Sequence, residues 1–217
     1  MAPNLLKLIN QTNKLSTWVA NAICKEDVLK KRRKIMVNMI LLCQQLFLLR
    51  NFNSVMGVLG GLAAAAVSRL KFTEEGLPPK VKKVFEDVQQ EMSSSNSFKT
   101  YRDKLRSSSA PTIPFIGVIL SDLTFIEDGN QDYTPDGLIY WAKRTLLYGV
   151  LSEFLEFQKS CQYTCTPIPS LADVVKHSMN TLNTPLKDLY DISLEIEPRG
   201  GLPQERPKTL LERLRGL

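Results

Sequence analysis

Residues 113–130 read Ile113-Pro-Phe-Ile-Gly-Val-Ile-Leu-Ser-Asp-Leu-Thr-Phe-Ile-Glu-Asp-Gly-Asn130, an almost unbroken apolar run followed by an acidic pair and a Gly-Asn turn. Such an apolar run is normally buried, whereas Glu127 and Asp128 belong at a surface or in a cleft. By local rules the part from Ile113 to Leu120, which is rich in Ile and Val, fits a buried strand as well as a helix. An element that is apolar along its body and acidic at its tip is suited to act as a wedge.

Most of the remaining chain has helical periodicity. Apolar residues repeat every three or four positions from Leu5 to Ile23, which predicts one amphipathic helix or two short ones. Two apolar stripes between Ile35 and Phe47 predict a central core helix. Pro78-Pro79 fits the first turn of another helix, and residues 138–158 are again amphipathic. We find no segment that would make a convincing partner strand for residues 113–120.

The segment from Asn51 to Leu70 is apolar and rich in Gly and Ala. Its three glycines, Gly57, Gly60 and Gly61, each lower the intrinsic helix propensity by about 1 kcal/mol relative to Ala. Small side chains allow two helices to approach closely, so we expect burial to supply the stability of this segment.

The composition is that of a soluble globular protein, with 43% apolar and 23% charged residues among 217 and a formal charge of +6. Much of the charge lies in Lys30-Lys-Arg-Arg-Lys34. A basic run can face nucleic acid, an anionic membrane or an acidic protein, and a solvated helix face is the simpler interpretation. The apolar stretches at 39–49 and 55–67 are too short or too interrupted to span a membrane. Since nothing at the N-terminus is typical of a signal peptide, we expect a cytoplasmic chain with reduced thiols.

The residues that usually carry metal binding or covalent catalysis are sparse. Cys161 and Cys165 are the only two of four cysteines close in sequence, and a structural zinc site needs four ligands. The single histidine, His177, has no Ser or Cys constellation around it. The stretch Gly57-Val-Leu-Gly-Gly61 lacks the Lys-Ser/Thr of a phosphate-binding loop. We therefore expect no metal, no cofactor and no NTPase activity.

Residues 113–130 closely resemble the signature of the Ras-family guanine-nucleotide exchange factor catalytic domain, the Cdc25-homology domain. Three further segments resemble that family in the same order: Asn51-Phe-Asn-Ser54 followed by Val67-Ser-Arg-Leu70, Phe98-Lys-Thr-Tyr-Arg102, and Leu189-Tyr-Asp-Ile-Ser-Leu-Glu-Ile-Glu-Pro-Arg199. The resemblance implies an all-α fold, a single irregular helical domain with a protruding helical hairpin. We expect this domain at residues 1–199, without the family's first helices, and a flexible basic tail at 200–217.

Members of this family release GDP from a Ras-type GTPase without making or breaking a covalent bond, so the resemblance implies an exchange catalyst and not a conventional enzyme. It also implies that residues 115–130 open the hairpin. Thr124 would then face the magnesium position and Asp128 the phosphate site. The accompanying hairpin residues are Ser121, Glu127 and Asn130.

The return helix of the hairpin carries Lys143 and Arg144, which match the family's basic pair. The resemblance further implies a hydrophobic pocket for switch II of the GTPase, formed by Ile9, Met56, Phe98 and Phe115. The implied partner is a Ras-family GTPase of the Ras, Rap or Ral type. No nucleic acid is expected, and recruitment to the inner face of the plasma membrane would come through the partner.

Other conspicuous residues are interpreted as structural. We expect Trp18 and Asn51-Phe-Asn53 to pack and cap helices. Glu197-Pro-Arg199 is expected to close the domain, with Pro198 ending the last helix.

The chain departs from the family where Ala63-Ala-Ala-Ala66 replaces a polar segment, and where Asp128 replaces the commoner Glu. The alanine run and the absence of the family's first helices leave an alternative open, a GTPase-binding or scaffold protein of the same fold with little or no exchange activity. A third interpretation is a membrane-surface protein that uses Lys30–Lys34 and an amphipathic helix in the tail.

Overall fold

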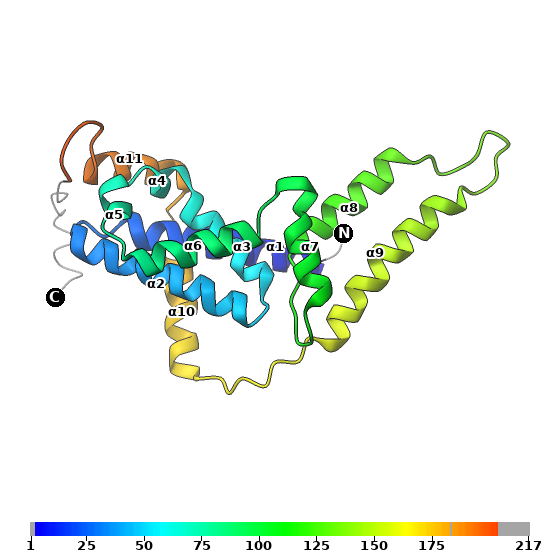
Figure 1. The fold of residues 1–217 in the computed structure, drawn as a ribbon, viewed down its shortest axis with the longest axis horizontal. Coiled ribbons are helices and arrows are strands. Elements are labelled where there is room, and N and C mark those ends of the chain that lie inside the picture. The colour runs from blue at the N-terminus through cyan, green and yellow to red at the C-terminus, as the bar shows by residue number, and fades with distance from the viewer. Residues whose placement is uncertain (1–2, 183, 204–217) are drawn as a thin grey trace. The chain divides into compact units, whose positions relative to one another are not determined.

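The computed structural model of the chain describes residues 3–182 and 184–203, and the regular elements among them are all helices (Figure 1). Within them, the only bridges between extended segments are single pairs, Asn51 with Ile113 and Tyr133 with Ile139. The all-α prediction is confirmed. The ambiguous run after Ile113 is a helix from Ile116 onward, as the resemblance implied.

The described residues divide into two compact units. The first, which we call the core unit, comprises the described residues within 3–43, 57–86, 168–182 and 184–203, and the second, the hairpin unit, comprises residues 44–56 and 87–167. The core unit contains α1 (Pro3–Cys24), α4 (Ala65–Ser68), α5 (Lys71–Glu75), α10 (Pro169–Thr181) and α11 (Leu186–Ile196). The hairpin unit contains α7 (Ser95–Ser107), α8 (Ile116–Gly129) and α9 (Trp141–Ser160), while α2 (Leu29–Leu48), α3 (Phe52–Ala63) and α6 (Pro79–Glu91) contribute residues to both.

Helix α1 is the centre of the core unit and packs on α4, α10 and α11. The expected close helix packing is found at Gly61, where a β-carbon would lie 2.6 Å from the carbonyl oxygen of Ser16. On another face of α1, the indole of Trp18 donates a hydrogen bond of 2.8 Å to the hydroxyl of Ser178 on α10. The predicted packing roles of the glycine-rich segment and of Trp18 are confirmed.

Helix α2 was expected to be a central core helix, and this is correct for only part of its surface. Met36, Ile40 and Cys43 from one predicted stripe are buried, whereas Leu42 from the other stripe is 36% exposed. The neighbouring Leu41 is 41% exposed. Periodicity identified the helix correctly but overestimated the width of its covered face.

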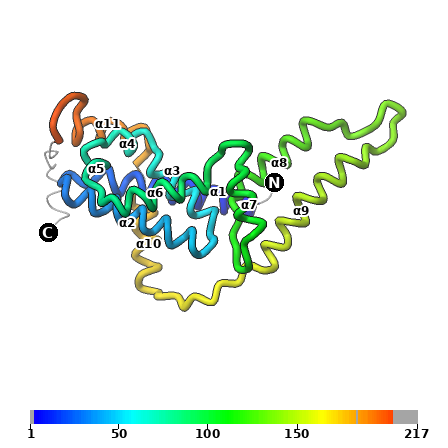
Figure 2. Tube along the Cα trace, viewed as in Figure 1, coloured from blue at the N-terminus to red at the C-terminus, as the bar shows by residue number. Residues whose placement is uncertain are grey.

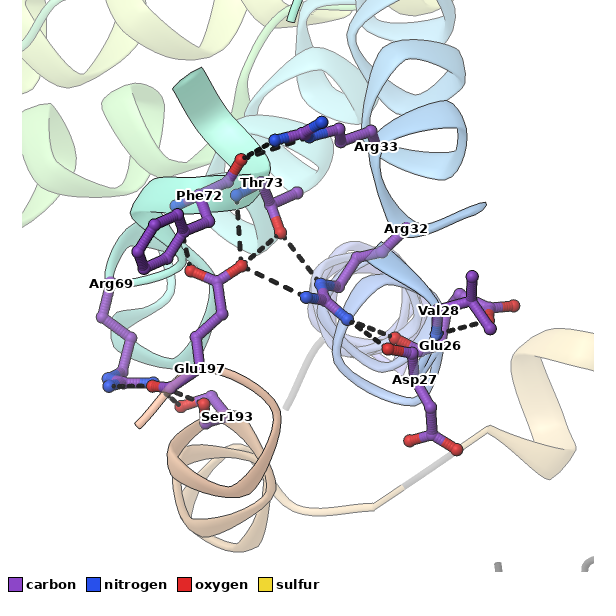
Figure 3. A network of polar contacts seen from close by, with 10 residues as sticks. All are labelled: Glu26, Asp27, Val28, Arg32, Arg33, Arg69, Phe72, Thr73, Ser193 and Glu197. Atoms are coloured by element: carbon purple, nitrogen blue, oxygen red, sulfur yellow. Dashed lines mark hydrogen bonds and ion pairs between the residues drawn. The ribbon is translucent and has the colours of Figure 1, made fainter. Parts of the chain in front are cut away.

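The basic run at the start of α2 is also only partly a solvated face. Arg32 is fully buried, and its guanidinium forms an ion pair of 3.2 Å with Glu197, which is 3% exposed (Figure 3). The other nitrogens of Arg32 donate to the carbonyl oxygens of Glu26 and Asp27 and to the hydroxyl of Thr73. Arg32 is therefore a structural residue of the core.

Glu197, directly after α11, binds the first turn of α5. Its carboxylate accepts hydrogen bonds from the hydroxyl of Thr73 at 2.6 Å, the backbone N–H of Thr73 at 3.1 Å and the backbone N–H of Phe72 at 3.0 Å. Arg69 donates to the carbonyl oxygens of Ser193 and Glu197. Since α11 ends at Ile196, the prediction that Glu197-Pro-Arg199 closes the fold is confirmed for Glu197.

In the hairpin unit, the predicted capping residues are found at two helix starts. The side-chain oxygen of Asn51 accepts a hydrogen bond from the backbone N–H of Ser54 in α3, and that of Asn53 accepts from the N–H of Ile116 in α8. Phe52 between them is fully buried and meets the ring of Tyr101 edge-on at 5.6 Å. These contacts fix the point from which α8 begins.

No helix among residues 3–182 and 184–203 is long and apolar enough to cross a membrane. The predicted helix at 209–217 and most of the predicted tail lie outside the described residues.

Candidate functional site

Helices α8 and α9 form an antiparallel hairpin within the hairpin unit, with α8 leading out and α9 returning (Figures 1 and 2). Phe115 is the N-cap residue of α8 in an extended conformation. The loop between the two helices is held by hydrogen bonds between Thr134 and Leu138 and by a bond from the Tyr140 N–H to the carbonyl oxygen of Asp132. The sequence expected to form a hairpin therefore does so.

One face of α8 is exposed along much of its length. It carries Ser121, Thr124, Phe125 and Asp128, which follow the i, i+3, i+4, i+7 spacing of a helix face. The hydroxyl of Thr124 donates to the carbonyl oxygen of Leu120 at 2.9 Å, which directs the hydroxyl back to the helix and leaves the methyl group for a partner. This face presents a methyl group and a carboxylate about one turn apart.

Phe125 belongs to the same face, and the sequence analysis missed it. Its side chain is 73% exposed, which is unusual for a phenylalanine and leaves a large apolar surface between Thr124 and Asp128. The signal was present in the sequence, because positions 121, 124, 125 and 128 share a face once the segment is known to be a helix.

The end of the hairpin is organised around Lys143, which is 1% exposed. Its ammonium lies 3.0 Å from a carboxylate oxygen of Glu127 and 3.1 Å from one of Asp132, and it donates to the carbonyl oxygen of Glu127 at 3.2 Å. Arg144, with a side chain that is 40% exposed, also contacts Asp132 at 2.7 Å. Asn130 donates to the carbonyl oxygen of Ile126 and caps the end of α8.

The pKa values of these groups reflect their contacts. Burial acts to lower the pKa of the Lys143 ammonium, but its bonds to Glu127 and Asp132 outweigh burial, so the pKa is raised. The hydrogen bond from Lys143, with a smaller contribution from Arg144, lowers the pKa of the Asp132 carboxyl. Lys143, Glu127 and Asp132 thus form a charged cluster that holds the tip together, and Glu127 does not share the exposed face of Asp128.

An aromatic cluster lies at the base of the hairpin. The rings of Phe98 and Phe115 lie 6.2 Å apart, and the ring of Tyr101 lies 6.3 Å from that of Phe98. The hydroxyl of Tyr101 accepts a hydrogen bond of 2.7 Å from the backbone N–H of Phe115. Phe98 and Phe115 are half-buried, as Met56 is on α3.

The structure therefore brings Phe98 and Phe115 together, as a pocket would require. Ile9, the fourth predicted pocket residue, lies half-buried on α1 of the core unit. Among the described residues, no group of three or more His, Cys, Asp or Glu side chains is placed to hold a metal ion.

Comparison with known proteins identifies the family. The sequence profile of the RasGEF domain matches residues 1–145. The chain belongs to the RasGEF domain family. It is 36% identical to the Ras guanine nucleotide exchange factor K of Dictyostelium discoideum over 204 residues. The aligned region covers 94% of this chain and 13% of that protein.

Two other Dictyostelium discoideum relatives are similar to the RasGEF chain over most of its length. The Ras guanine nucleotide exchange factor J is 38% identical over 199 residues, 91% of this chain and 24% of that protein. The Ras guanine nucleotide exchange factor Y is 40% identical over 197 residues, 91% of this chain and 13% of that protein. The chain thus spans between 13% and 24% of the length of these three relatives.

Proposed function

We propose that this chain is a guanine-nucleotide exchange factor for a Ras-family small GTPase of the Ras, Rap or Ral type. The observation that carries the proposal is the exposed face of α8, on which Thr124 and Asp128 are presented by a helical hairpin. In a chain of the RasGEF family, this is the arrangement that can enter the nucleotide site of a partner. Recruitment to a membrane then comes through the GTPase.

The mechanism is differential binding between two states of the partner. The exchange factor binds the nucleotide-free GTPase more tightly than the GDP-bound form, and so it lowers the affinity of the GTPase for GDP by the same factor. Asp128 competes with phosphate for the lysine of the phosphate-binding loop, because both anions interact with one positive charge. Thr124 places a methyl group at the magnesium position, where it offers the ion no ligand.

The second part of the proposal is a pocket for switch II of the GTPase. Phe98, Phe115 and Met56 of the hairpin unit are assigned to it, since an aromatic anchor in an apolar pocket is a common form of binding hot spot. Ile9 of the core unit is assigned to GTPase binding by itself. Arg144 is assigned to the GTPase surface because its side chain is 40% exposed, even though its guanidinium pairs with Asp132. Lys143 is assigned to the hairpin tip, since a contact with the partner would have to replace its internal ion pairs.

A second candidate function is a GTPase-binding protein with little exchange activity. Ala63 and Ala65 favour it, because both are exposed yet offer no hydrogen-bonding side chain. A lost hydrogen bond to the partner costs about 0.5–1.5 kcal/mol, which is up to about tenfold in affinity. This cost reduces binding without touching the hairpin.

The experiment that separates the two functions is fluorescent-GDP release from a panel of Ras, Rap, Ral and Rho-type GTPases, with and without the chain at micromolar concentration. We expect release from one Ras-family member to accelerate. A chain that melts cooperatively and binds a GTPase but leaves every release rate unchanged would be a binder only. A chain that neither binds nor accelerates any GTPase would refute both functions.

A further inference from the structure

The segment before the aromatic cluster has an unusual backbone. Asn96, Ser97 and Phe98 have φ angles of 51°, 54° and 61° with positive ψ, which places three consecutive residues in the left-handed region. None is a glycine, and each such residue costs about 1–2 kcal/mol relative to the right-handed conformation. Surrounding contacts must therefore hold this turn in place.

Arg102 supplies one of these contacts. Its Nε–H donates a hydrogen bond of 2.9 Å to the carbonyl oxygen of Ser97, the residue directly before Phe98. A lysine could not reproduce this bond together with the others that Arg102 makes, because its single ammonium lacks the fork of a guanidinium.

The guanidinium of Arg102 also forms an ion pair with a residue of α8. Its two terminal nitrogens donate to the two carboxylate oxygens of Asp122, both at 2.7 Å, which is the bidentate geometry of a strong charge-assisted pair. The hydrogen bond with Asp122 also raises the pKa of Arg102. The Arg102 side chain thus links two parts of the hairpin unit. One is the turn that ends at Phe98, and the other is the middle of α8, the helix that carries Thr124 and Asp128.

The two side chains lie in a crevice at the base of the hairpin. A small cavity of about 50 Å³ is lined there by residues of α7, α8 and α9, including Arg102, Asp122, Glu153 and Phe157. The side chains of Arg102 and Asp122 are 30% and 28% exposed, so the pair is partly screened by water. A pair of this kind contributes little to global stability, typically about 0–1 kcal/mol.

The Arg102–Asp122 pair has more influence on the orientation of α8 than on global stability. From Phe115 to Asp128 α8 rises about 20 Å at 1.5 Å per residue, so rotating the helix by about 5° about its start would displace its far end by nearly 2 Å. A misplacement of about 1 Å at a reacting centre can reduce a rate by about a hundredfold. A link near the middle of α8 therefore controls the position of the exposed face better than it controls folding.

We propose that Arg102 and Asp122 are positioning residues for nucleotide exchange, which hold the hairpin helix α8 at a fixed angle to the aromatic cluster of Phe98 and Phe115. The pair transmits partner binding at the cluster to the exposed face of α8. This inference rests on the proposed exchange function. It assigns no contact between the pair and the GTPase.

The first test is the kinetics of fluorescent-GDP release over a range of chain concentrations. In Arg102→Lys and Asp122→Asn we expect the maximal release rate to fall about tenfold, with the half-saturating concentration changed less than threefold. The double variant should lose no more than either single variant, since both remove one link. The matched control is Arg106→Lys, which alters an exposed pair with Asp103 at 3.5 Å on the same helix and should leave both parameters unchanged.

A purely structural role would lower the melting temperature and the active fraction but leave the maximal rate per folded molecule unchanged. An unchanged maximal rate in a folded Arg102→Lys chain would overturn the proposal. A loss confined to the half-saturating concentration would overturn it as well, because it would indicate that the pair binds the GTPase directly.

The second test does not depend on exchange activity. Spin labels are attached to cysteines placed at Lys99 on α7 and Gly129 at the end of α8, with Cys161 and Cys165 replaced by serine. We expect a narrow distance distribution that broadens in Arg102→Lys and stays narrow in the control variant. A distribution that stays narrow in Arg102→Lys would refute the positioning role, even if the wild-type chain released no GDP. Broadening in a chain without exchange activity would refute the proposed function alone.

Discussion

Replacing Glu197 by alanine tests whether the buried network closes the core unit. The carboxylate of Glu197 accepts four bonds, from the Arg32 guanidinium and from the Thr73 hydroxyl, the Thr73 N–H and the Phe72 N–H. Its removal leaves a fully buried guanidinium without its counter-charge and two backbone donors without an acceptor. Removing one partner of a buried ion pair typically costs about 3–5 kcal/mol, a large share of the 5–15 kcal/mol that stabilises a domain.

The assay is urea unfolding followed by tryptophan fluorescence. The chain has two tryptophans, and Trp141, which lies in the hairpin unit, is 73% exposed and can be replaced by phenylalanine. The fluorescence of Trp18 on α1 then reports the unfolding of the core unit alone. The transition can therefore be treated as two-state even if the two units unfold separately. With an m-value of about 2 kcal/mol/M, we expect the midpoint in Glu197→Ala to fall by about 2 M.

The matched control is Glu195→Ala, an exposed glutamate in the last turn of α11, which should change stability by less than about 0.5 kcal/mol. The stability of the Glu197→Gln variant should lie between those of Glu197→Ala and Glu195→Ala. Glutamine keeps the shape of the side chain and one acceptor oxygen but removes the negative charge. If Glu197→Ala were no less stable than the control variant, the network would not close the core unit, and the structural interpretation of Arg32 would be wrong.

Three further predictions address other parts of the chain. Asp128→Ala and Thr124→Asp should each change the GDP-release rate several-fold with the melting temperature within about 2 °C of wild type, and unchanged rates in both would refute the hairpin assignment. Gly61→Ala should lower the unfolding free energy by about 1–3 kcal/mol through its 2.6 Å approach to the Ser16 carbonyl, whereas Gly149→Ala, whose β-carbon meets nothing within 4 Å, should raise it by about 0.5–1 kcal/mol. Burial raises the pKa of the Cys24 and Cys43 thiols to about 12, so that both stay protonated at pH 8. A thiol reagent at pH 8 should therefore modify only the other two cysteines of the folded chain and all four in urea, and rapid reaction of four thiols without denaturant would contradict this burial.

The helices could be predicted from the sequence because their cause is local. Apolar spacing places α1, α6 and α9 within a few residues of their observed ends, and Asn51 caps the start of α3 through a short side chain that such a position favours. The left-handed turn at Asn96–Phe98 could not be predicted in this way. Local propensity disfavours it in residues other than glycine, and Arg102, which donates to Ser97, is itself held by Asp122 on α8, 20 residues away.

Charged residues show the same division between local and distant causes. Lys30–Lys34 is one basic run by local rules, yet Arg32 differs from its neighbours because its partner Glu197 is 165 residues away. Burying an arginine is tolerated only where such a partner exists, and only the folded chain supplies it. The sequence therefore specified the charge of this helix face but not which cation leaves the solvent.

In the candidate site, the fold gives the adjacent residues Lys143 and Arg144 different surroundings. Adjacent residues on a helix point about 100° apart, so Lys143 and Arg144 approach the carboxylates of the hairpin tip from different sides, although both contact Asp132. The structure buries the lysine between Glu127 and Asp132 and leaves the arginine partly exposed. Resemblance identifies the two as a basic pair with one role, whereas the geometry divides the role. Lys143 is enclosed in the charged cluster of the tip, whereas Arg144 pairs with Asp132 at the surface, where we propose that it also meets the GTPase.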